Sequence, residues 1–311
     1  MGADYIPIFI PSYHRPKNLK TIYWFLKLGY PAEKLYVFID DATDDTELYR
    51  AEAERLGFNL VQFNMDEARA RYDYVHRPSN SRRSAGQARN MFADYARERE
   101  IEIYIAIDDD TSNYQLRPAN IYKRTASLKE LNIVFNSIKK LMLKWHIGLF
   151  GLSQTGDTYS YDVNNRSFRS KVMNTMFVCP RYLDRAERGV QDDDTSQFVG
   201  IYNEGLFTGS LFTGLVLVQT QSAKQKGGLT DLYNECRLLN KALVTPIQFP
   251  TAIHAEKQTM NGGRLHHRIT SRYLMPCIIK GKGARTNIPW DTYPEDYPFT
   301  NEPKNRLKHN G

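Results

Sequence analysis

The chain has 311 residues, enough for one large domain or two smaller ones with a sizeable core. Hydrophobic residues make up 41% of it and charged residues 25%, which is ordinary for a soluble globular protein, and no run approaches the roughly 20 apolar residues of a membrane span. The net charge of +7 favours anionic partners, nucleic acid among them, although many basic proteins bind no polymer.

The spacing of the cysteines and the residues at the amino terminus indicate the cellular compartment of the protein. Cys179, Cys236 and Cys277 lie far apart, without CxxC spacing and without the density of a disulfide scaffold. The chain enters an apolar stretch at residues 5–11 without the basic region and cleavage site of a secretory signal. We therefore expect buried free thiols and a soluble cytoplasmic protein.

Strand and helix patterns alternate in the amino-terminal part of the chain. Apolar, β-branched and aromatic runs predict strands, and apolar residues at helical spacing predict helices. The predicted strands cover residues 5–11, 34–39, 59–63 and 101–107. The predicted helices cover residues 18–28, 46–56 and 84–96. This order is typical of a parallel sheet with crossover helices. The polar, basic and aromatic residues 64–84 are either a mobile loop over a site or a solvated linker.

The carboxyl-terminal part is less regular. Its predicted helices cover residues 127–145, 182–188 and 230–239, and its predicted strands cover residues 147–152, 171–179, 213–220 and 247–249. Residues 153–170 and the basic segment from Thr251 onward are predicted as loops. No repeat, low-complexity segment or sharp linker divides the chain, so we expect a single α/β domain.

The strand predicted over residues 101–107 ends on three adjacent carboxylates, Asp108, Asp109 and Asp110. Four isoleucines alternate with Glu102, Tyr104 and Ala106, a pattern that favours a buried central strand. Adjacent carboxylates repel one another, so solvent, a cation or a positive partner must offset the cost. Ligands bind at this end of the strands in open α/β sheets. A solvated acidic turn is the alternative, and the position directly after a buried strand favours a divalent cation.

A second acidic triplet, Asp192, Asp193 and Asp194, permits a division of labour. If the first triplet holds a cation that neutralises a leaving diphosphate, the second can supply a general base for an acceptor hydroxyl. The alternative is a helix N-terminus, where Asp caps the helix and interacts with its dipole. Taken alone, the second triplet slightly favours that alternative.

Basic and imidazole side chains are further candidates. Arg82, Arg83 and Arg89 precede the central strand and either meet phosphate oxygens or are ordinary surface arginines. His254 is a candidate imidazole ligand for the same metal, in competition with His266 and His267.

Four short segments, in this order and spacing, resemble a GT-A fold nucleotide-sugar glycosyltransferase over about the first 115 residues: Ile10-Pro-Ser-Tyr-His-Arg15, Phe38-Ile-Asp-Asp41, Gly86-Gln-Ala-Arg-Asn90 and Ile105-Ala-Ile-Asp-Asp-Asp110. No GxxxxGK[ST] or GxGxxG motif competes with this interpretation. The resemblance implies one domain with a mixed, mostly parallel sheet flanked by helices. Residues 1–115 would bind the nucleotide sugar, residues 116–279 would bind the acceptor and carry catalysis, and residues 280–311 would form a tail.

The resemblance also implies roles for individual residues at the donor. Pro11 and Tyr13 would line the base, Asp40 would meet base or ribose, and Arg89 with Asn90 would organise the nucleotide pocket. The other residues expected at the nucleotide sugar are Arg15, Arg83, Gly86, Asp108 and Asp109.

The metal and the base follow from the same resemblance. Asp108 to Asp110 would be the DxD motif, in which Asp110 is the direct ligand of Mn²⁺ or Mg²⁺ and Asp108 is shared between metal and ribose. His254 would take the place of a carboxyl-terminal metal-binding histidine. Asp192, Asp193 and Asp194 fall where inverting members carry the catalytic base, but Gln191 replaces the first acidic member, so the three are not separated.

The acceptor is indicated by loops that mix basic and aromatic residues, at 72–77, 82–83, 122–124, 224–226 and 264–272. With them the chain is similar in outline to the DNA base glycosyltransferases associated with TET/JBP-type hydroxylases, including those of base J synthesis and of phages with hypermodified DNA. That similarity implies transfer of a hexose, most simply glucose from UDP-glucose, to 5-hydroxymethyluracil or 5-hydroxymethylcytosine in a bacterial or phage-infected cell, after extrusion of the base. The alternatives are a bacterial glycan or protein acceptor, and an inactive nucleic-acid-binding module on the same scaffold.

Overall fold

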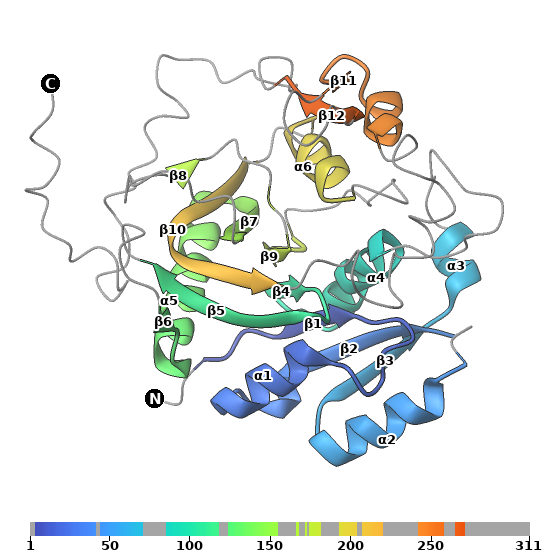
Figure 1. Cartoon of the computed structure of the whole chain (residues 1–311), viewed down its shortest axis with the longest axis vertical. Coiled ribbons are helices and arrows are strands. Elements are labelled where there is room, and N and C mark those ends of the chain that lie inside the picture. Colours follow the sequence, from blue (N-terminus) through green and yellow to red (C-terminus); the bar gives the residue numbers. More distant parts are fainter. Residues whose placement is uncertain are drawn as a thin grey trace, which may run out of the picture.

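The computed structural model describes residues 4–41, 44–70, 85–117, 124–154, 166–167, 172, 174–181, 193–203, 207–219, 242–257 and 265–270. In this part of the chain, helices lie on both faces of a mixed β-sheet (Figure 1). The expected mixed α/β architecture is therefore confirmed. No helix in these ranges combines the length and apolar character that crossing a membrane requires.

The amino-terminal elements follow the predicted alternation. They are β1 (Ile8–Pro11), α1 (Lys20–Leu28), η1 (Ala32–Lys34), β2 (Leu35–Asp40), α2 (Thr46–Leu56), β3 (Asn59–Phe63), α3 (Met65–Ala70), α4 (Ala85–Glu98) and β4 (Tyr104–Ile107). Two short elements were not predicted: the single 3-10 turn η1, and the helix α3, which lies in the polar segment predicted as a loop or linker. Helices α1 and α2 end on Gly29 and Gly57, whose φ angles of 86° and 80° are left-handed and suit glycine.

The later elements depart more from the prediction. They are β5 (Thr111–Arg117), β6 (Arg124–Thr125), α5 (Leu128–Trp145), β7 (Ile147–Gln154), β8 (Arg166–Ser167), β9 (Thr175–Val178), α6 (Asp193–Asn203), β10 (Phe207–Gln219), β11 (Ile253–Lys257) and β12 (Leu265–Ile269). The strand predicted over residues 247–249 is wrong, because residues 242–248 are helical and Ile247 is 62% exposed. The hairpin of β11 and β12 replaces a predicted loop. The helices predicted over residues 182–188 and 230–239 lie outside the described residues.

The sheet has a point where the order of its strands reverses. Its strands run in the order β3-β2-β1-β4-β9-β7-β10-β5-β6, and β1 pairs in parallel with both β2 and β4. From β1 the chain moves outward to β2 and β3, and then returns to place β4 on the other side of β1. The loops after β1 and β4 therefore leave the same edge of the sheet next to each other. Such a reversal forms a crevice at the carboxyl ends of the strands.

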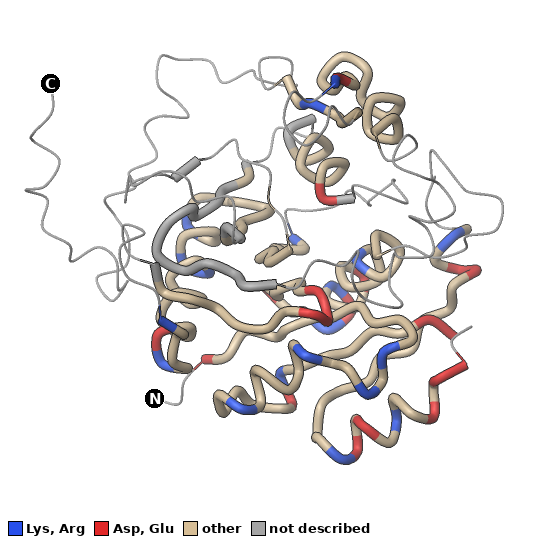
Figure 2. The backbone as a smooth tube through the Cα atoms, viewed as in Figure 1, with Lys and Arg blue, Asp and Glu red and all other residues tan. Residues whose placement is uncertain are grey.

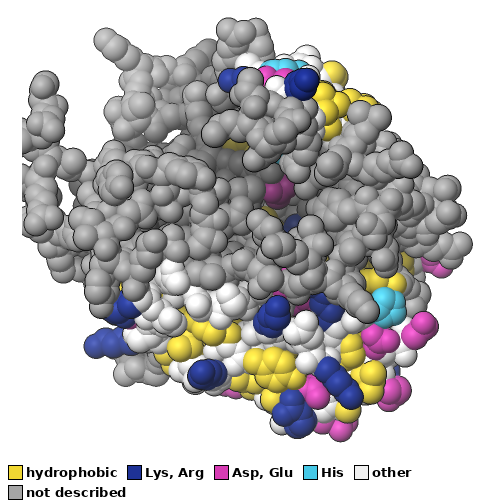
Figure 3. Space-filling view, viewed as in Figure 1, with side chains coloured by type: hydrophobic (Ala, Val, Ile, Leu, Met, Phe, Trp, Pro, Cys, Tyr) yellow, Lys and Arg dark blue, Asp and Glu magenta, His cyan; other side chains and the backbone are white. Residues whose placement is uncertain are grey.

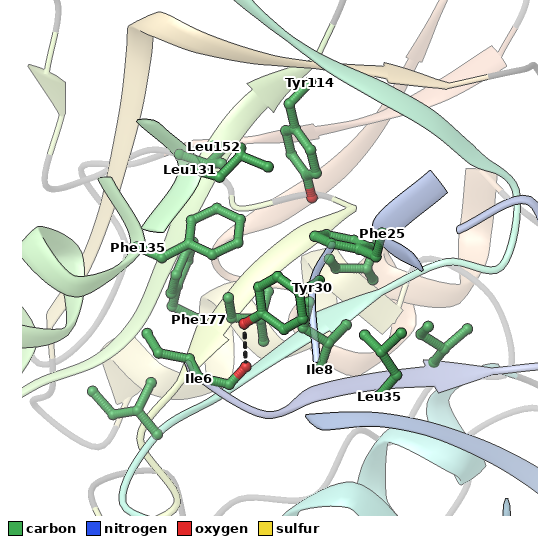
Figure 4. Close-up of a cluster of buried hydrophobic side chains, with 14 of the residues drawn as sticks. Ile6, Ile8, Phe25, Tyr30, Leu35, Tyr114, Leu131, Phe135, Leu152 and Phe177 are labelled. Atoms are coloured by element: carbon green, nitrogen blue, oxygen red, sulfur yellow. Dashed lines mark hydrogen bonds between the residues drawn. The ribbon is translucent and has the colours of Figure 1, made fainter. Parts of the chain in front are cut away.

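Two hydrophobic cores cover the two faces of the sheet. One joins the sheet to α1 and α5, and Figure 4 shows its side chains, with the Tyr30 hydroxyl donating to the carbonyl of Ile6 at 2.6 Å. The other joins the sheet to α3, α4 and α6. Ile105 and Ile107 of β4 face the first core, whereas Tyr104 and Ala106 face the second. The prediction that β4 is a central strand buried on both faces is confirmed.

Helix α5 begins with a capping box, which makes a testable contribution to stability. The Ser127 hydroxyl accepts from the Glu130 N–H at 3.4 Å, and the Glu130 carboxylate accepts from the Ser127 N–H at 2.9 Å. Arg124 also donates to this carboxylate, at 2.8 Å from its Nη1 atom. The hydrogen bond from Arg124, followed by those from Ser127, lowers the pKa of Glu130 to about 2.

Removing this cap is expected to weaken the fold most at neutral pH. We expect Ser127→Ala and Glu130→Gln each to lower the free energy of unfolding by about 1 kcal/mol at pH 7. Because the pKa of Glu130 is lower in the folded protein, its contribution is complete above the ordinary value of 4.5 and is lost as the pH falls toward 2. Urea unfolding of Glu130→Gln at pH 7 and pH 3 measures this, with Glu98→Gln as an exposed control. A deficit that does not shrink at pH 3 would contradict the assignment.

Candidate active site

The first acidic triplet lies where the strand order reverses. Asp108, Asp109 and Asp110 follow β4 directly, and the loop of residues 12–15 follows β1 at the same edge of the sheet. In Figure 2 the turn between β4 and β5 is marked as acidic in the middle of the molecule. Figure 3 shows acidic and basic side chains near the middle of this face. The structure thus brings together two of the segments that the sequence singled out.

Asp109 points into the protein and pairs with the loop after β1. Its Oδ2 atom accepts from the Ser12 hydroxyl at 2.8 Å, and its Oδ1 atom lies 2.6 Å from Nη1 of Arg15. Both members of the ion pair are buried, with 7% of each side chain exposed. Burial raises the pKa of the Asp109 carboxyl to about 6, against the opposing effects of the Arg15 charge and the Ser12 hydrogen bond.

The loop after β1 is itself anchored to helix α2. The buried Tyr49 hydroxyl lies 2.8 Å from the Ser12 hydroxyl and accepts from the Arg15 N–H at 3.0 Å. His14 adopts the left-handed conformation at φ 53°, and its Nδ1 atom lies 3.0 Å from a carboxylate oxygen of Asp45. These contacts hold the loop in place before and after His14, and they thereby position Arg15.

Asp108 meets a different arginine. Its Oδ1 atom lies 2.9 Å from Nη2 of Arg89, which projects from α4. The Asp108 side chain is 27% exposed, more than that of Asp109. Two arginines from different parts of the chain, Arg15 and Arg89, therefore form ion pairs with the triplet.

The backbone of the turn is held by Thr21, at the start of α1. The Thr21 hydroxyl donates to the Asp108 carbonyl at 2.5 Å and accepts from the Thr111 N–H at 3.0 Å. The Thr21 N–H donates to the Asp109 carbonyl at 3.2 Å. Thr21 is completely buried. One residue of α1 thus spans the whole turn from β4 to β5.

A break in strand register follows the triplet immediately. The pairing of β5 with β10 passes from Asn113 opposite Val218 to Thr111 opposite Gln219, so Ser112 is an extra residue. Such bulges bend a strand and redirect side chains, and they are frequent beside active sites. This one separates the regular part of β5 from the acidic turn.

The other residues expected at the donor are spread along this edge of the sheet. Asp110, Asp40 and Asn90 are buried, with 3%, 5% and 4% of their surface exposed. Pro11 and Tyr13 are half-buried, whereas Gly86, in the first turn of α4, is buried. Arg83 lies outside the described residues. The donor roles of all these residues remain predictions.

The second triplet lies at the start of α6. The helix begins at Asp193, and Oδ1 of the half-buried Asp194 accepts from the Thr195 N–H at 2.8 Å. The alternative predicted from the sequence, a helix N-terminus, is therefore present. The role of the triplet as general base stays a prediction. Asp192 lies outside the described residues. In the view of Figure 2, the acidic start of α6 is the end of the helix that faces the sheet.

The first turn of α6 is tied to the carboxyl-terminal hairpin. The buried Thr195 hydroxyl lies 3.3 Å from Nε2 of His267 on β12, and the Ser196 hydroxyl donates to the side chain of Gln248. Phe198 and Val199 pack against Ala252 and Ile253. The hairpin thus fixes the start of α6.

His254 lies on β11, with 53% of its side chain exposed and its Nε2 atom 3.6 Å from Glu256. Among the described residues, no three side chains of His, Cys, Asp or Glu come together as a metal site, so His254 does not join Asp108 and Asp110 in this structure. Its role as a ligand remains a prediction. Two carboxylates do suit Mg²⁺ or Mn²⁺, which commonly combine one or two carboxylates with substrate phosphates and water.

Thr21, Ser12 and Tyr49 were missed by the sequence analysis. For Thr21 a weak signal exists, because it shares the buried face of α1 with Ile22 and Phe25, where a polar residue needs a partner. The partner itself lies about 90 positions further along the chain, so no local pattern identifies it.

No protein-family model and no curated protein matches the sequence. Solved structures of glucosyl-3-phosphoglycerate synthase from Mycobacterium tuberculosis are similar. One, in complex with Mn²⁺, UDP-glucose and phosphoglyceric acid, has 12% identity and a TM-score of 0.45, with 85% of this chain and 86% of that chain covered. Another has 11% identity and a TM-score of 0.46, with 81% and 84% covered.

Proposed function

We propose that this protein is a metal-dependent GT-A glycosyltransferase that moves a hexose, most simply glucose from UDP-glucose, onto the hydroxymethyl group of 5-hydroxymethyluracil or 5-hydroxymethylcytosine in DNA. The observation that carries the proposal is the acidic turn. Asp108 and Asp110 follow a strand buried on both faces, at the reversal of strand order, and Arg89 forms an ion pair with Asp108. Acids and bases arranged in this way suit a metal and the diphosphate of a nucleotide.

Asp108 and Asp110 would hold Mn²⁺ or Mg²⁺, which neutralises the charge that develops on the departing nucleoside diphosphate. Pro11, Tyr13, Asp40 and Asn90 would bind and orient the nucleotide. Each of these four lies at the carboxyl edge of β1 or β2, or on α4.

In the reaction, the acceptor oxygen forms a bond to the anomeric carbon while the bond from that carbon to the diphosphate oxygen breaks. A carboxylate of the second triplet takes the proton of the acceptor hydroxyl. Attack from the side opposite the leaving group inverts the configuration of the sugar. The first turn of α6, held by His267 and Gln248, would keep this carboxylate in place.

DNA as the acceptor is supported by charge. The chain carries a net charge of +7, which raises the local concentration of a polyanion. Most of the basic and aromatic loops that indicated DNA lie outside the described residues. Of the lysines and arginines in those loops, Arg124 and Arg268 are described, and they form ion pairs with Glu130 and Glu256.

The purified protein, incubated with Mn²⁺ and a panel of nucleotide sugars, tests donor and acceptor together. The acceptors are duplexes containing 5-hydroxymethyluracil, 5-hydroxymethylcytosine or neither, and phosphoglyceric acid, which is bound in one of the similar structures. We expect nucleoside mass spectrometry to find a hexose on one modified base and none on the unmodified duplex. Donor hydrolysis without transfer to DNA would contradict the acceptor, and no turnover of any donor would contradict the enzyme class.

A further inference from the structure

We propose that Asp109 and Arg15 do not contact the donor but act, with Thr21, as positioning residues that set the geometry of the turn carrying Asp108 and Asp110. This inference rests on the proposed function and deepens it. It separates the middle carboxylate of the triplet from its two neighbours. It also assigns a positioning role to Thr21, which no sequence motif indicates.

The Asp109 carboxylate is buried and points into the protein. Both of its carboxylate oxygens have protein partners, Ser12 on one and Arg15 on the other, at 2.8 and 2.6 Å. Only 5% of Asp109 and 7% of Arg15 are exposed. A carboxylate held in this way is directed toward the loop after β1. Ligand binding by Asp109 would require breaking a buried ion pair, which is strongly unfavourable.

The pair of Asp109 and Arg15 is anchored to helix α2. Ser12 and Arg15 are both hydrogen-bonded to Tyr49, which is completely buried on α2. The pair therefore connects the acidic turn to a packed helix, through a loop that cannot shift without losing these bonds. A chain of satisfied, buried polar groups of this kind specifies one geometry.

The backbone on the other side of the turn is held by helix α1. Thr21 bonds the carbonyls of Asp108 and Asp109 and the N–H of Thr111. These three backbone groups bracket Asp110. Because the positions of metal-binding carboxylates follow from their backbone, Thr21 determines where the Asp108 and Asp110 side chains begin. Partners of this kind typically change metal affinity roughly 10- to 100-fold when removed.

Thr21→Val tests the backbone contact, because valine has the shape of threonine without the hydroxyl. We expect the Kd for Mn²⁺, measured by electron paramagnetic resonance with and without UDP, to rise roughly 10-fold or more. Thr21→Ser keeps the hydroxyl and should bind Mn²⁺ nearly as the wild type does. The matched control is Tyr30→Phe, which removes a buried hydrogen bond to Ile6 at the opposite end of β1. It should lose comparable stability and keep its Mn²⁺ affinity.

Arg15 and Asp109 are tested as a pair. Arg15→Met leaves a buried carboxylate without its cation and should weaken Mn²⁺ binding, whereas Arg15→Met combined with Asp109→Leu removes both charges and should recover most of it. If Arg15 or Asp109 contacted the donor, the double variant would be no better than the single one. That result, or an unchanged Mn²⁺ affinity in Thr21→Val, overturns the inference and leaves the proposed function standing. A wild-type protein that binds no Mn²⁺ even with UDP overturns both.

Discussion

Replacing Asp110 with alanine is expected to lower kcat for hexose transfer by roughly 1,000-fold or more, because a metal ligand that stabilises the leaving diphosphate is worth several kcal/mol in the transition state. Asp110 is only 3% exposed and lies between the backbone groups held by Thr21. Its backbone position is therefore fixed. The measurement is the initial rate of product formation at saturating donor and a series of Mn²⁺ concentrations.

The control for this variant is Asp66→Asn, which removes a carboxylate charge from α3, where 92% of the side chain is exposed. It should leave the rate unchanged. Urea unfolding of both variants separates loss of the ligand from loss of the fold. An Asp110→Ala protein that is folded and transfers hexose within about tenfold of the wild-type rate, a difference of only about 1.4 kcal/mol in the barrier, would show that Asp110 is not a ligand.

Phe9→Ala is expected to cause the largest loss of stability, about 3 to 5 kcal/mol, because a large buried ring is removed from a packed core. Phe9 is completely buried in the middle of β1. Its ring stacks on Tyr104 with centroids 4.7 Å apart and meets Phe38 and Phe92 at 5.1 and 5.6 Å. The aromatic rings come from β1, β2, β4 and α4, so their contacts hold together the elements that carry the proposed site.

Chemical denaturation at neutral pH measures this loss. Phe9→Leu fills much of the space and should cost clearly less than Phe9→Ala, whereas Leu48→Ala, at a position 47% exposed on α2, should change the free energy of unfolding by no more than about 0.5 kcal/mol. Equal losses in the free energy of unfolding for Phe9→Ala and Leu48→Ala would contradict the conclusion that the aromatic contacts of Phe9 stabilise the fold.

Elements that depend on local spacing of residues could be predicted from the sequence, whereas elements that depend on contacts between distant residues could not. Helix α2 and strand β3 were predicted with their observed bounds, because alternating and helical spacing are local properties. Strand β5 was missed, since only Tyr114 and Leu116 of its seven residues are buried apolar side chains. The strand predicted over residues 247–249 and the loop predicted in place of the hairpin were wrong, because apolar side chains of this region, among them Ala252 and Ile253, pack against α6, which is distant in the sequence.

Local patterns were enough to predict that an acidic triplet follows a strand buried on both faces, and that its charge needs a cation or a basic partner. Which carboxylate faces which partner was decided only by the tertiary structure. Arg15 and Asp109 are 94 positions apart, Thr21 and Thr111 are 90 apart, and Thr195 and His267 are 72 apart. Contacts over such separations exist only after β1 and β4 have paired and the helices have packed on the sheet, because no local pattern encodes the direction of a side chain toward a distant residue.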